Sequence, residues 1–208
     1  YYDGDPASNR SRVWSYGVRN PFRFTLHPAS GEIYIGDVGW FSWEEIDTGR
    51  AENFGWPCYE GGNAINVRHP SYQWYTGTQS ICQPLYDNEP DNGVQPPLYA
   101  YPNPGELFGG AAIVMGAFYT DTGDGSTLTY PPAYHDALFF ATYGANTIEY
   151  LTFDHSGAAT QHDFMRDVSQ LGSPVHITLG PDGYLYYAAL NPRPNGESAI
   201  RRTRYTDN

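Results

Sequence analysis

The stretch from residue 15 to residue 61 has the chain's densest set of side chains suited to binding or catalysis. The element Arg19-Asn20-Pro21 comes first, and a fixed guanidinium can stabilise negative charge that develops on an oxygen. The acidic pair Glu44-Glu45 follows, and carboxylate oxygens suit a hard cation such as Ca²⁺. Each feature also has a structural interpretation. Arg19 would then only join backbone carbonyl oxygens, and Glu44-Glu45 would be a surface pair at the start of a strand.

A recurring turn-and-strand pattern indicates which elements position these residues. Residues 27–36, 131–141 and 180–188 each begin with a turn rich in Pro, Gly or Asp and continue into a short apolar, aromatic strand. Pro132 and Pro181 are 49 residues apart, and Pro28 and Pro132 are 104 apart, about two such units. A period near ~50 residues is typical of four-stranded propeller blades. The sequence therefore predicts an all-β fold, a β-propeller of four-stranded antiparallel blades.

The remaining segments define the expected domain. Second strands are predicted at residues 146–154 and 198–202, since each follows a turn. Residues 63–105 are rich in Pro, Tyr, Asn and Gln with weak periodicity, so we expect a long surface insertion there. Four repeats fit into residues 1–208, which we interpret as one propeller domain of about four blades. The chain begins at Tyr1 without an initiator Met or a signal peptide, which favours part of a larger propeller over a complete four-bladed one.

Composition excludes several classes of function. The net charge of −12 repels phosphate backbones, so nucleic acid is not an expected partner. All 11 basic residues are Arg, which removes a P-loop lysine, a lysine Schiff base and a lysine general base. No stretch approaches the ~18 consecutive apolar residues that a membrane span requires. Aromatic residues make up 16% of the chain, enough to build a core, so bulk disorder is excluded.

Cys58 and Cys82 are the only cysteines in the sequence. In an acidic chain rich in Tyr, Asn and Gly, two cysteines favour a disulfide formed outside the cytoplasm. Two buried free thiols are the alternative. The disulfide would cross the expected insertion, and it predicts a secreted protein, either extracellular or periplasmic.

Four elements, in this order, resemble the glucose/sorbosone dehydrogenase family. They are residues 17–21 (G-x-R-N-P), residues 36–39 (G-[DE]-x-G), the pair Glu44-Glu45, and residues 53–57 (N-F-G-W-P). Residues 172–177 and 180–183 also look like the late-blade pattern of that family. The resemblance implies a six-bladed propeller, of which this chain would be about the C-terminal two-thirds, with missing N-terminal blades as partners. It further implies a secreted quinoprotein that oxidises a sugar.

The resemblance also implies roles for individual residues. Arg19 and Asn20 match family positions that contact the C5 carbonyl region of pyrroloquinoline quinone (PQQ), as catalytic and cofactor-binding residues, with Trp40 beside the cofactor. Calcium would bridge the cofactor and the backbone carbonyls of Gly39 and Trp40, with the side chains of Glu44 and Glu45 close by. The substrate would be a sugar or polysaccharide, oxidised at its C1 hydroxyl by hydride transfer to the quinone.

The sequence departs from the family pattern in its catalytic base and its cofactor anchors. The family's base is a His on a blade before R-N-P, and no His precedes Arg19, so we expect that base upstream of Tyr1. A cofactor-binding Lys aligns near Gly144, and two Arg align with Ser173 and Val175. Three cations that hold the tricarboxylate are thus missing, which would weaken cofactor binding.

Two functions remain open on the sequence. One is a PQQ-dependent aldose dehydrogenase, which predicts bound calcium and an axial pocket that holds the quinone. The other is a non-catalytic secreted propeller that binds carbohydrate or a protein partner, as in the hedgehog-interacting protein, which looks like the same fold. That second function predicts a central cleft without room or charge for a tricarboxylate. A glycosidase would need two carboxylates facing each other about 5–9 Å apart, and the sequence does not pair them.

Overall fold

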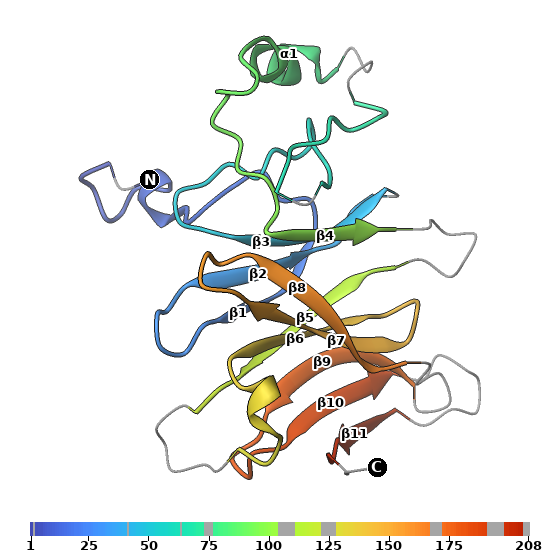
Figure 1. Cartoon of the computed structure of the whole chain (residues 1–208). Helices are drawn as coiled ribbons and strands as arrows, with labels where there is room; N and C mark the ends of the chain where they lie inside the picture. Colours follow the sequence, from blue (N-terminus) through green and yellow to red (C-terminus); the bar gives the residue numbers. More distant parts are fainter. Residues whose placement is uncertain are drawn as a thin grey trace.

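The computed structural model describes residues 1, 3–40, 42–62, 64–72, 77–103, 111–121, 128–166, 172–190 and 198–205 (Figure 1). Two short 3-10 turns, η1 (Arg10–Arg12) and η3 (Pro132–Tyr134), and the helix α1 (Gln79–Asp87) accompany its strands. The strands are β1 (Pro21–Leu26), β2 (Ile33–Asp37), β3 (Trp43–Thr48), β4 (Tyr99–Pro102), β5 (Ile113–Tyr119), β6 (Ala137–Thr142), β7 (Thr147–Phe153), β8 (Ala159–Met165), β9 (Ser173–Leu179), β10 (Leu185–Leu190) and β11 (Ala199–Arg202).

The described strands form three antiparallel sheets in which neighbours along the chain pair with each other. We call them blade 1 (β1-β2-β3-β4), blade 2 (β5-β6-β7-β8) and blade 3 (β9-β10-β11). The first strands of the blades lie side by side, since β1 packs against β5 and β5 packs against β9 (Figure 1). Antiparallel meanders with their first strands around one axis are the arrangement of a propeller, so the predicted fold class is confirmed.

The repeated turns occupy equivalent places in the three blades. Each joins the first strand of a blade to its second: residues 27–32 between β1 and β2, residues 131–136 between β5 and β6, and residues 180–184 between β9 and β10. Gly31 and Gly183 adopt φ values of +70° and +75°, a backbone region that favours glycine. The repeat identified in the sequence is therefore the turn between the first and second strands of each blade.

Between β3 and β4 the chain departs from the blade pattern. Residues 49–98 have the length of one blade, but their described part forms α1, turns and isolated bridges, so the described residues make three sheets rather than about four. Of the expected insertion at 63–105, residues 99–102 form β4 and complete blade 1. Residues 63, 73–76, 104 and 105 of that segment lie outside the described residues.

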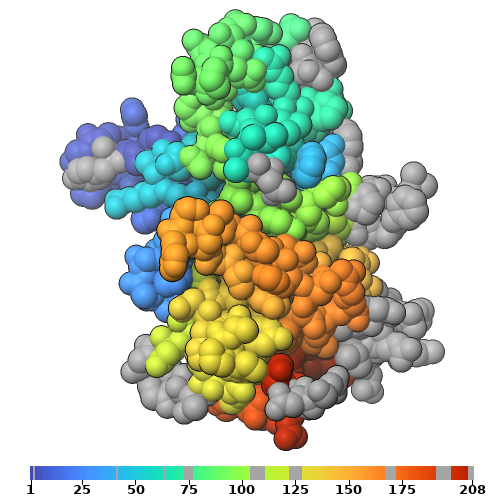
Figure 2. All heavy atoms as spheres, in the orientation of Figure 1, coloured from blue at the N-terminus to red at the C-terminus, as the bar shows by residue number. Residues whose placement is uncertain are grey.

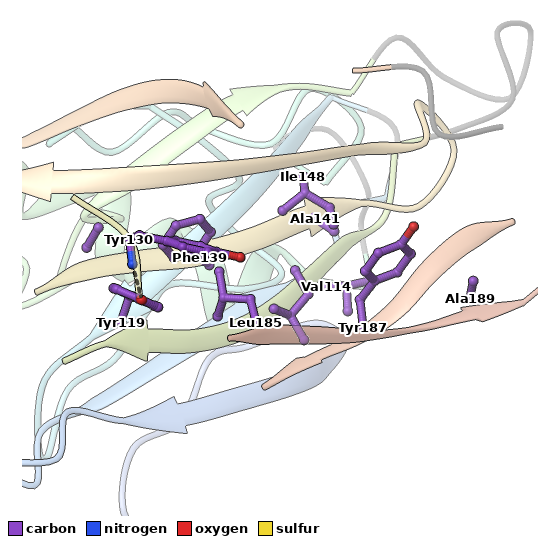
Figure 3. Close-up of a cluster of buried hydrophobic side chains, with 11 residues drawn as sticks. Val114, Tyr119, Tyr130, Phe139, Ala141, Ile148, Leu185, Tyr187 and Ala189 are labelled. Carbon is purple, nitrogen blue, oxygen red and sulfur yellow. Dashed lines mark hydrogen bonds between the residues drawn. The ribbon is translucent and has the colours of Figure 1, made fainter. Parts of the chain in front are cut away.

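Apolar side chains fill both spaces between the blades. Between blades 1 and 2 the buried cluster contains Ile46, Ile113, Met115, Phe118, Leu138, Phe140 and Leu151. Between blades 2 and 3 it includes Val114, Tyr119, Tyr130, Phe139, Ile148, Ile177, Leu185 and Tyr187 (Figure 3). Alternate residues of β6 serve the two clusters, because successive side chains on a strand point to opposite faces. This is why β6 is buried along its whole length.

We call residues 49–98, which contain both cysteines, the disulfide segment. The disulfide segment and blade 3 occupy opposite ends of an elongated molecule (Figure 2). The helix α1 has nine residues and packs at the first of these ends. In the part of the chain that the structure describes, no helix has the length and apolarity to cross a bilayer.

Candidate functional site

Arg19 and Asn20 lie directly before β1, where a buried carboxylate fixes their backbone. The N–H of Arg19 donates to Oδ2 of Asp37 at 2.7 Å, and the N–H of Asn20 donates to Oδ1 of the same residue at 2.6 Å. Asp37 is the last residue of β2 and is only 2% exposed. Burial raises the pKa of Asp37 to about 6, although the two N–H groups and the nearby Arg19 charge act to lower it. The strand end therefore sets where both side chains begin.

The head of Arg19 is held on one side and available on the other. Its Nη1 donates to the carbonyl oxygens of Val38 and Gly39, each at 2.9 Å. The guanidinium carbon lies 5.9 Å from the Trp40 ring centre and 5.7 Å from that of Trp56. The Nε and Nη2 groups of Arg19 donate no hydrogen bond to any described residue. Arg19 thus makes the backbone contacts of the structural interpretation and keeps N–H groups that a ligand oxygen can accept.

Asn20 is exposed and lines a pocket of about 290 Å³ at the axis end of the three blades. The other lining residues come from all three blades and are mostly apolar: Phe22, Val38, Ala112, Val114, Tyr143, Val175 and Leu190. We call this the axial pocket. The side-chain amide of Asn20 makes no hydrogen bond within the described residues. The described residues of the wall carry no formal charge, although Arg23 of β1 donates from Nε to the carbonyl oxygen of Val175 at 3.2 Å.

Three buried carboxylates lie together on one face of blade 1. Asp37 pairs with Glu45 across β2 and β3, and Asp47 is two residues further along β3, so all three point to the same face. Their oxygens lie within 4.8 Å of one another, and the residues are 2%, 7% and 1% exposed. Both carboxylate oxygens of Asp47 accept no hydrogen bond from the described residues. We call these three residues the carboxylate cluster.

The protonation chemistry of the carboxylate cluster reflects its burial. Loss of solvent raises the pKa of Glu45 to about 8 and raises that of Asp47 well above its usual value, and the neighbouring carboxylates add to both shifts. The N–H of Gly61 also donates to Oε1 of Glu45. Three carboxylates this close repel one another when ionised, and a bound cation would remove that repulsion. The donor set is all oxygen, as calcium prefers.

The residues expected to bind calcium fall into different places. Glu44 points to the opposite face of β3 from Glu45, because adjacent strand residues alternate. There its two oxygens accept from the Asn103 side chain at 2.7 Å and the Ile113 N–H at 2.8 Å, which connects blade 1 to blade 2. The Gly39 carbonyl already accepts from Arg19, and the Trp40 ring is 46% exposed. The structure therefore brings Glu45 together with Asp37 and Asp47, and not with Glu44.

A further buried acid, Glu60, was missed by the sequence analysis. It holds the turn that follows β2. Oε1 of Glu60 accepts from the N–H groups of Trp40, Ser42 and Trp43, each at 3.1 Å. Its Oε2 lies 2.8 Å from Nε2 of His69, and both side chains are at most 1% exposed. Burial acts to raise the pKa of Glu60, but hydrogen bonds from His69 and the backbone outweigh it, so the pKa is lowered. Glu60 follows the N-F-G-W-P element closely, and that proximity was its only signal in the sequence.

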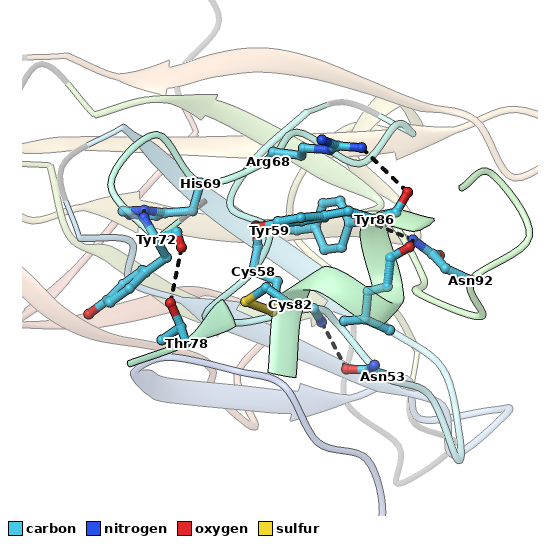
Figure 4. Close-up of a disulfide and its surroundings, with 12 residues drawn as sticks. Asn53, Cys58, Tyr59, Arg68, His69, Tyr72, Thr78, Cys82, Tyr86 and Asn92 are labelled. Atoms are coloured by element: carbon cyan, nitrogen blue, oxygen red, sulfur yellow. Dashed lines mark hydrogen bonds between the residues drawn. A yellow bond between two sulfur atoms is a disulfide. The ribbon is translucent and has the colours of Figure 1, made fainter. Parts of the chain in front are cut away.

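The predicted disulfide between Cys58 and Cys82 is confirmed (Figure 4). It joins the segment after Trp56 to α1, and both cysteines are 1% exposed. The N–H of His69 donates to the carbonyl oxygen of Cys58 at 2.8 Å, so the disulfide and the Glu60–His69 pair belong to one packed unit.

Comparisons with known proteins agree with the fold. A family model described as Glucose / Sorbosone dehydrogenase matches residues 3–195. The aldose sugar dehydrogenase YliI of Escherichia coli is 24% identical over 189 residues, which cover 90% of this chain and 43% of YliI. A glucose dehydrogenase crystal structure aligns over 98% of this chain with a TM-score of 0.63 and 21% identity, and this chain covers 51% of it.

A PQQ-bound aldose sugar dehydrogenase from Streptomyces coelicolor aligns over 97% of this chain with a TM-score of 0.59 and 14% identity, and this chain covers 47% of it. The chain therefore spans about half the length of these relatives.

Proposed function

This chain belongs to the glucose/sorbosone dehydrogenase family, and we propose on that basis that it is part of a PQQ-dependent aldose dehydrogenase. In the proposed reaction the C1 hydroxyl of the sugar loses its proton to a base, and the C1 hydride passes to the quinone. The base in this proposal is a histidine on another blade, as the family resemblance implies. The observation that carries the proposal is the position of Asn20 in a pocket shared by three blades, with Arg19 hydrogen-bonded to Val38 of its wall.

The side chains at the axial pocket suit a quinone oxygen. Bound PQQ would supply the acceptor for the hydride. Arg19 has N–H groups on Nε and Nη2 that point to no described acceptor, and a guanidinium stabilises negative charge on a carbonyl oxygen. The Asn20 amide offers a further donor, and Asp37 fixes both backbones. Arg23 places a second guanidinium against Val175, a position where the family has an Arg. This fit supports PQQ despite the missing Lys.

We place the proposed calcium ion at the carboxylate cluster. Asp37, Glu45 and Asp47 offer oxygen ligands from two paired strands, and the unpartnered oxygens of Asp47 are buried with no other way to be satisfied within the described residues. Because Asp37 also holds the N–H groups of Arg19 and Asn20, a cation there would stabilise the site without touching the substrate.

Further blades of the same protein are the proposed neighbours of β1. Phe22, Phe24 and Leu26 of β1 are 50%, 62% and 51% exposed, an unusual row of large apolar side chains for a solvated strand. The three blades and the half-length coverage of the relatives fit a six-bladed assembly. The disulfide supports a secreted or periplasmic location, since such bonds persist in oxidising compartments.

A second candidate function has its own supporting observation. Among the described residues, the axial pocket is lined by Asn20 and mostly apolar side chains, with no charged residue. A tricarboxylate needs cationic partners there, and Arg19 and Arg23 only border it. A non-catalytic propeller that binds carbohydrate or a protein partner would need no such cations.

Titration of PQQ into the purified chain with saturating calcium distinguishes the two candidates. We expect saturable quenching of tryptophan fluorescence, and a Kd raised about tenfold or more in Arg19→Gln, since a charge-assisted hydrogen bond contributes about 1.5–3 kcal/mol. Arg50→Gln is the matched control, because Arg50 is exposed and contacts the Trp14 ring instead. Dye-linked oxidation of aldoses is then measured on the full-length protein, in which the blade with the proposed histidine base is present. Failure of PQQ to bind at saturating calcium would leave the binding module as the function.

A further inference from the structure

Four rings form a contiguous cluster beside Arg19. Tyr72 contacts Trp40, Trp56 and His69, with ring centres 5.2, 5.3 and 4.8 Å apart. Trp40 and Trp56 lie 6.1 Å apart, and His69 contacts both. We call these four residues the aromatic cluster. His69 is fully buried, Trp56 and Tyr72 are half-buried, and Trp40 is 46% exposed, so the cluster runs from the interior to the surface.

Buried residues hold Trp40, the exposed member of the aromatic cluster, in place. The backbone of Trp40 is fixed by the hydrogen bond from its N–H to Glu60, and the next described residues donate to the same oxygen. Nδ1 of His69 lies 3.2 and 3.3 Å from the N–H groups of Ser71 and Tyr72 and therefore accepts, so the ring proton sits on Nε2 and points to Glu60. A ring held in this way loses little freedom when a ligand stacks on it.

Polar groups that suit hydroxyls border the same rings. Arg19 lies between Trp40 and Trp56 with donors on Nε and Nη2 that no described residue uses. Val38 contributes its carbonyl to Arg19 and its side chain to the axial pocket, so the aromatic cluster and the axial pocket are adjacent.

We propose that the aromatic cluster is a carbohydrate-stacking subsite, with Trp40 as the platform for a sugar unit of a neutral oligosaccharide or polysaccharide. A sugar ring presents a C–H face that packs on an aromatic ring and a rim of hydroxyls that accept from Arg19. A neutral sugar unit needs no counter-charge at these rings, unlike the tricarboxylate proposed for the axial pocket. A cationic ligand is disfavoured because Arg19 already lies against both indole rings.

The subsite rests on the proposed function for its orientation, because it places the next sugar unit of the substrate beside the axial pocket. It implies that chains of several sugar units, rather than single aldoses, are the preferred ligands. The stacking itself requires no cofactor, so the subsite and the oxidation can be tested separately.

Isothermal titration with reduced oligosaccharides tests the subsite without turnover. The probes are borohydride-reduced cellohexaose, maltohexaose, xylohexaose and chitohexaose, whose alditol ends have no C1 hemiacetal to oxidise. We expect at least one to bind the chain saturably, and Trp40→Ala to raise its Kd about tenfold or more. Trp40→Phe keeps a ring and should give an intermediate Kd. Trp14→Ala is the matched control, since Trp14 is also 46% exposed but contacts Arg50.

The outcomes separate the subsite from the dehydrogenase. An unchanged Kd in folded Trp40→Ala, or no binding of any of the four probes by the parent chain, would overturn the subsite. An equal effect of Trp14→Ala would do the same, because it would show general aromatic adsorption. Oligosaccharide binding that depends on Trp40, in a chain that does not bind PQQ, would uphold the subsite while the dehydrogenase proposal fails. Circular dichroism and thermal unfolding of each variant show whether it is folded.

Discussion

Blades 1 and 2 share a strand order but bury opposite kinds of side chain. The second strand of blade 2, β6, reads ALFFAT and is buried at all six positions between two apolar clusters. The third strand of blade 1, β3, reads WEEIDT, and three of its four fully buried residues are acidic. Both strands satisfy the same ladder of backbone hydrogen bonds. The backbone ladder therefore does not explain the buried acids: Glu44 connects the two blades, whereas Asp47 has no partner among the described residues.

The two blades also differ in the free energy of burying their side chains. Burial of hydrocarbon stabilises a fold by about 25 cal/mol per Å², whereas burial of a carboxylate costs free energy unless it is paired, protonated or bound to a cation. Glu44 and Glu60 are paired with backbone or side-chain donors, but Asp47 is not paired with any described residue. The disulfide closes the loop of residues 58–82, which contains Glu60, and by loop entropy it contributes about 3 kcal/mol. Blade 1 therefore carries most of the candidate site, and the apolar clusters on both faces of blade 2 stabilise the fold.

The largest effect is expected from the core of blade 2. Phe139 is fully buried (Figure 3). Its ring contacts those of Tyr150 and Phe164, with centres 5.3 and 5.1 Å away. Phe139→Ala leaves a cavity in a close-packed space and should lower the free energy of unfolding by about 3–5 kcal/mol, measured by urea titration. Phe24→Ala, at a side chain 62% exposed, should change it by less than about 0.5 kcal/mol. Equal effects at the two positions would show that blade 2 is not the supporting core.

A smaller effect, of opposite sign, is expected in blade 1. In calcium-free buffer, at a pH high enough to ionise the cluster, Asp47→Asn should raise the melting temperature, because it removes one of three mutually repelling buried carboxylates while keeping the side-chain shape. Calcium should raise the melting temperature of the parent chain, by linkage equivalent to about 2.7 kcal/mol at one hundred times its Kd, and should do so far less in Asp47→Asn.

Asp163→Asn is the control for the carboxylate cluster. Asp163 is an exposed carboxylate of blade 2 that pairs with Arg166, so its replacement should leave the calcium response of the chain unchanged. Magnesium serves as a second control, because it dehydrates reluctantly and seldom binds in an all-protein cage. A parent chain whose melting temperature ignores calcium would rule out the cation site and would leave the cluster to be neutralised by protonation.

The fold could be predicted from local signals. Turn residues at 27–32 and 180–184 mark the blade corners by their chemistry alone, and the strands that follow begin within a residue or two of the expected positions. Residues 49–98 could not be placed, because they lack periodicity and are organised by the disulfide and by side-chain contacts far apart in sequence. The short strand β4 was hidden there, since four residues give too little alternation to recognise.

At the site, residue types were easier to predict than partners. Glu44 and Glu45 were expected to act together, but strand alternation sends them to opposite faces, and only a fixed register reveals which one joins Asp37. The same alternation was a usable signal for Asp47, which shares the parity of Glu45. The contact of Glu60 with His69 joins two loop segments, and no spacing rule predicts such a pair.

The smallest effect is expected from the ion pair at the edge of the disulfide segment. Arg68 donates to both oxygens of Glu89, at 3.0 and 2.6 Å, and its hydrogen bonds lower the pKa of Glu89. The side chains are 43% and 33% exposed, so solvent screens the pair and Glu89→Gln should destabilise the chain by less than about 1 kcal/mol at pH 7.

The pH dependence of that difference tests its electrostatic origin. A Glu whose pKa is lower in the folded state than its usual value of about 4.3 stabilises the fold above that value, and the stabilisation is lost as pH falls through the folded pKa. The parent chain and Glu89→Gln should therefore differ in urea stability at pH 7 and converge under more acidic conditions. A difference that persisted in acid would mean that the hydrogen bond from the Tyr59 hydroxyl to Glu89, rather than the charge of Glu89, holds this edge. Charge would then contribute to stability in the carboxylate cluster and not at this peripheral ion pair.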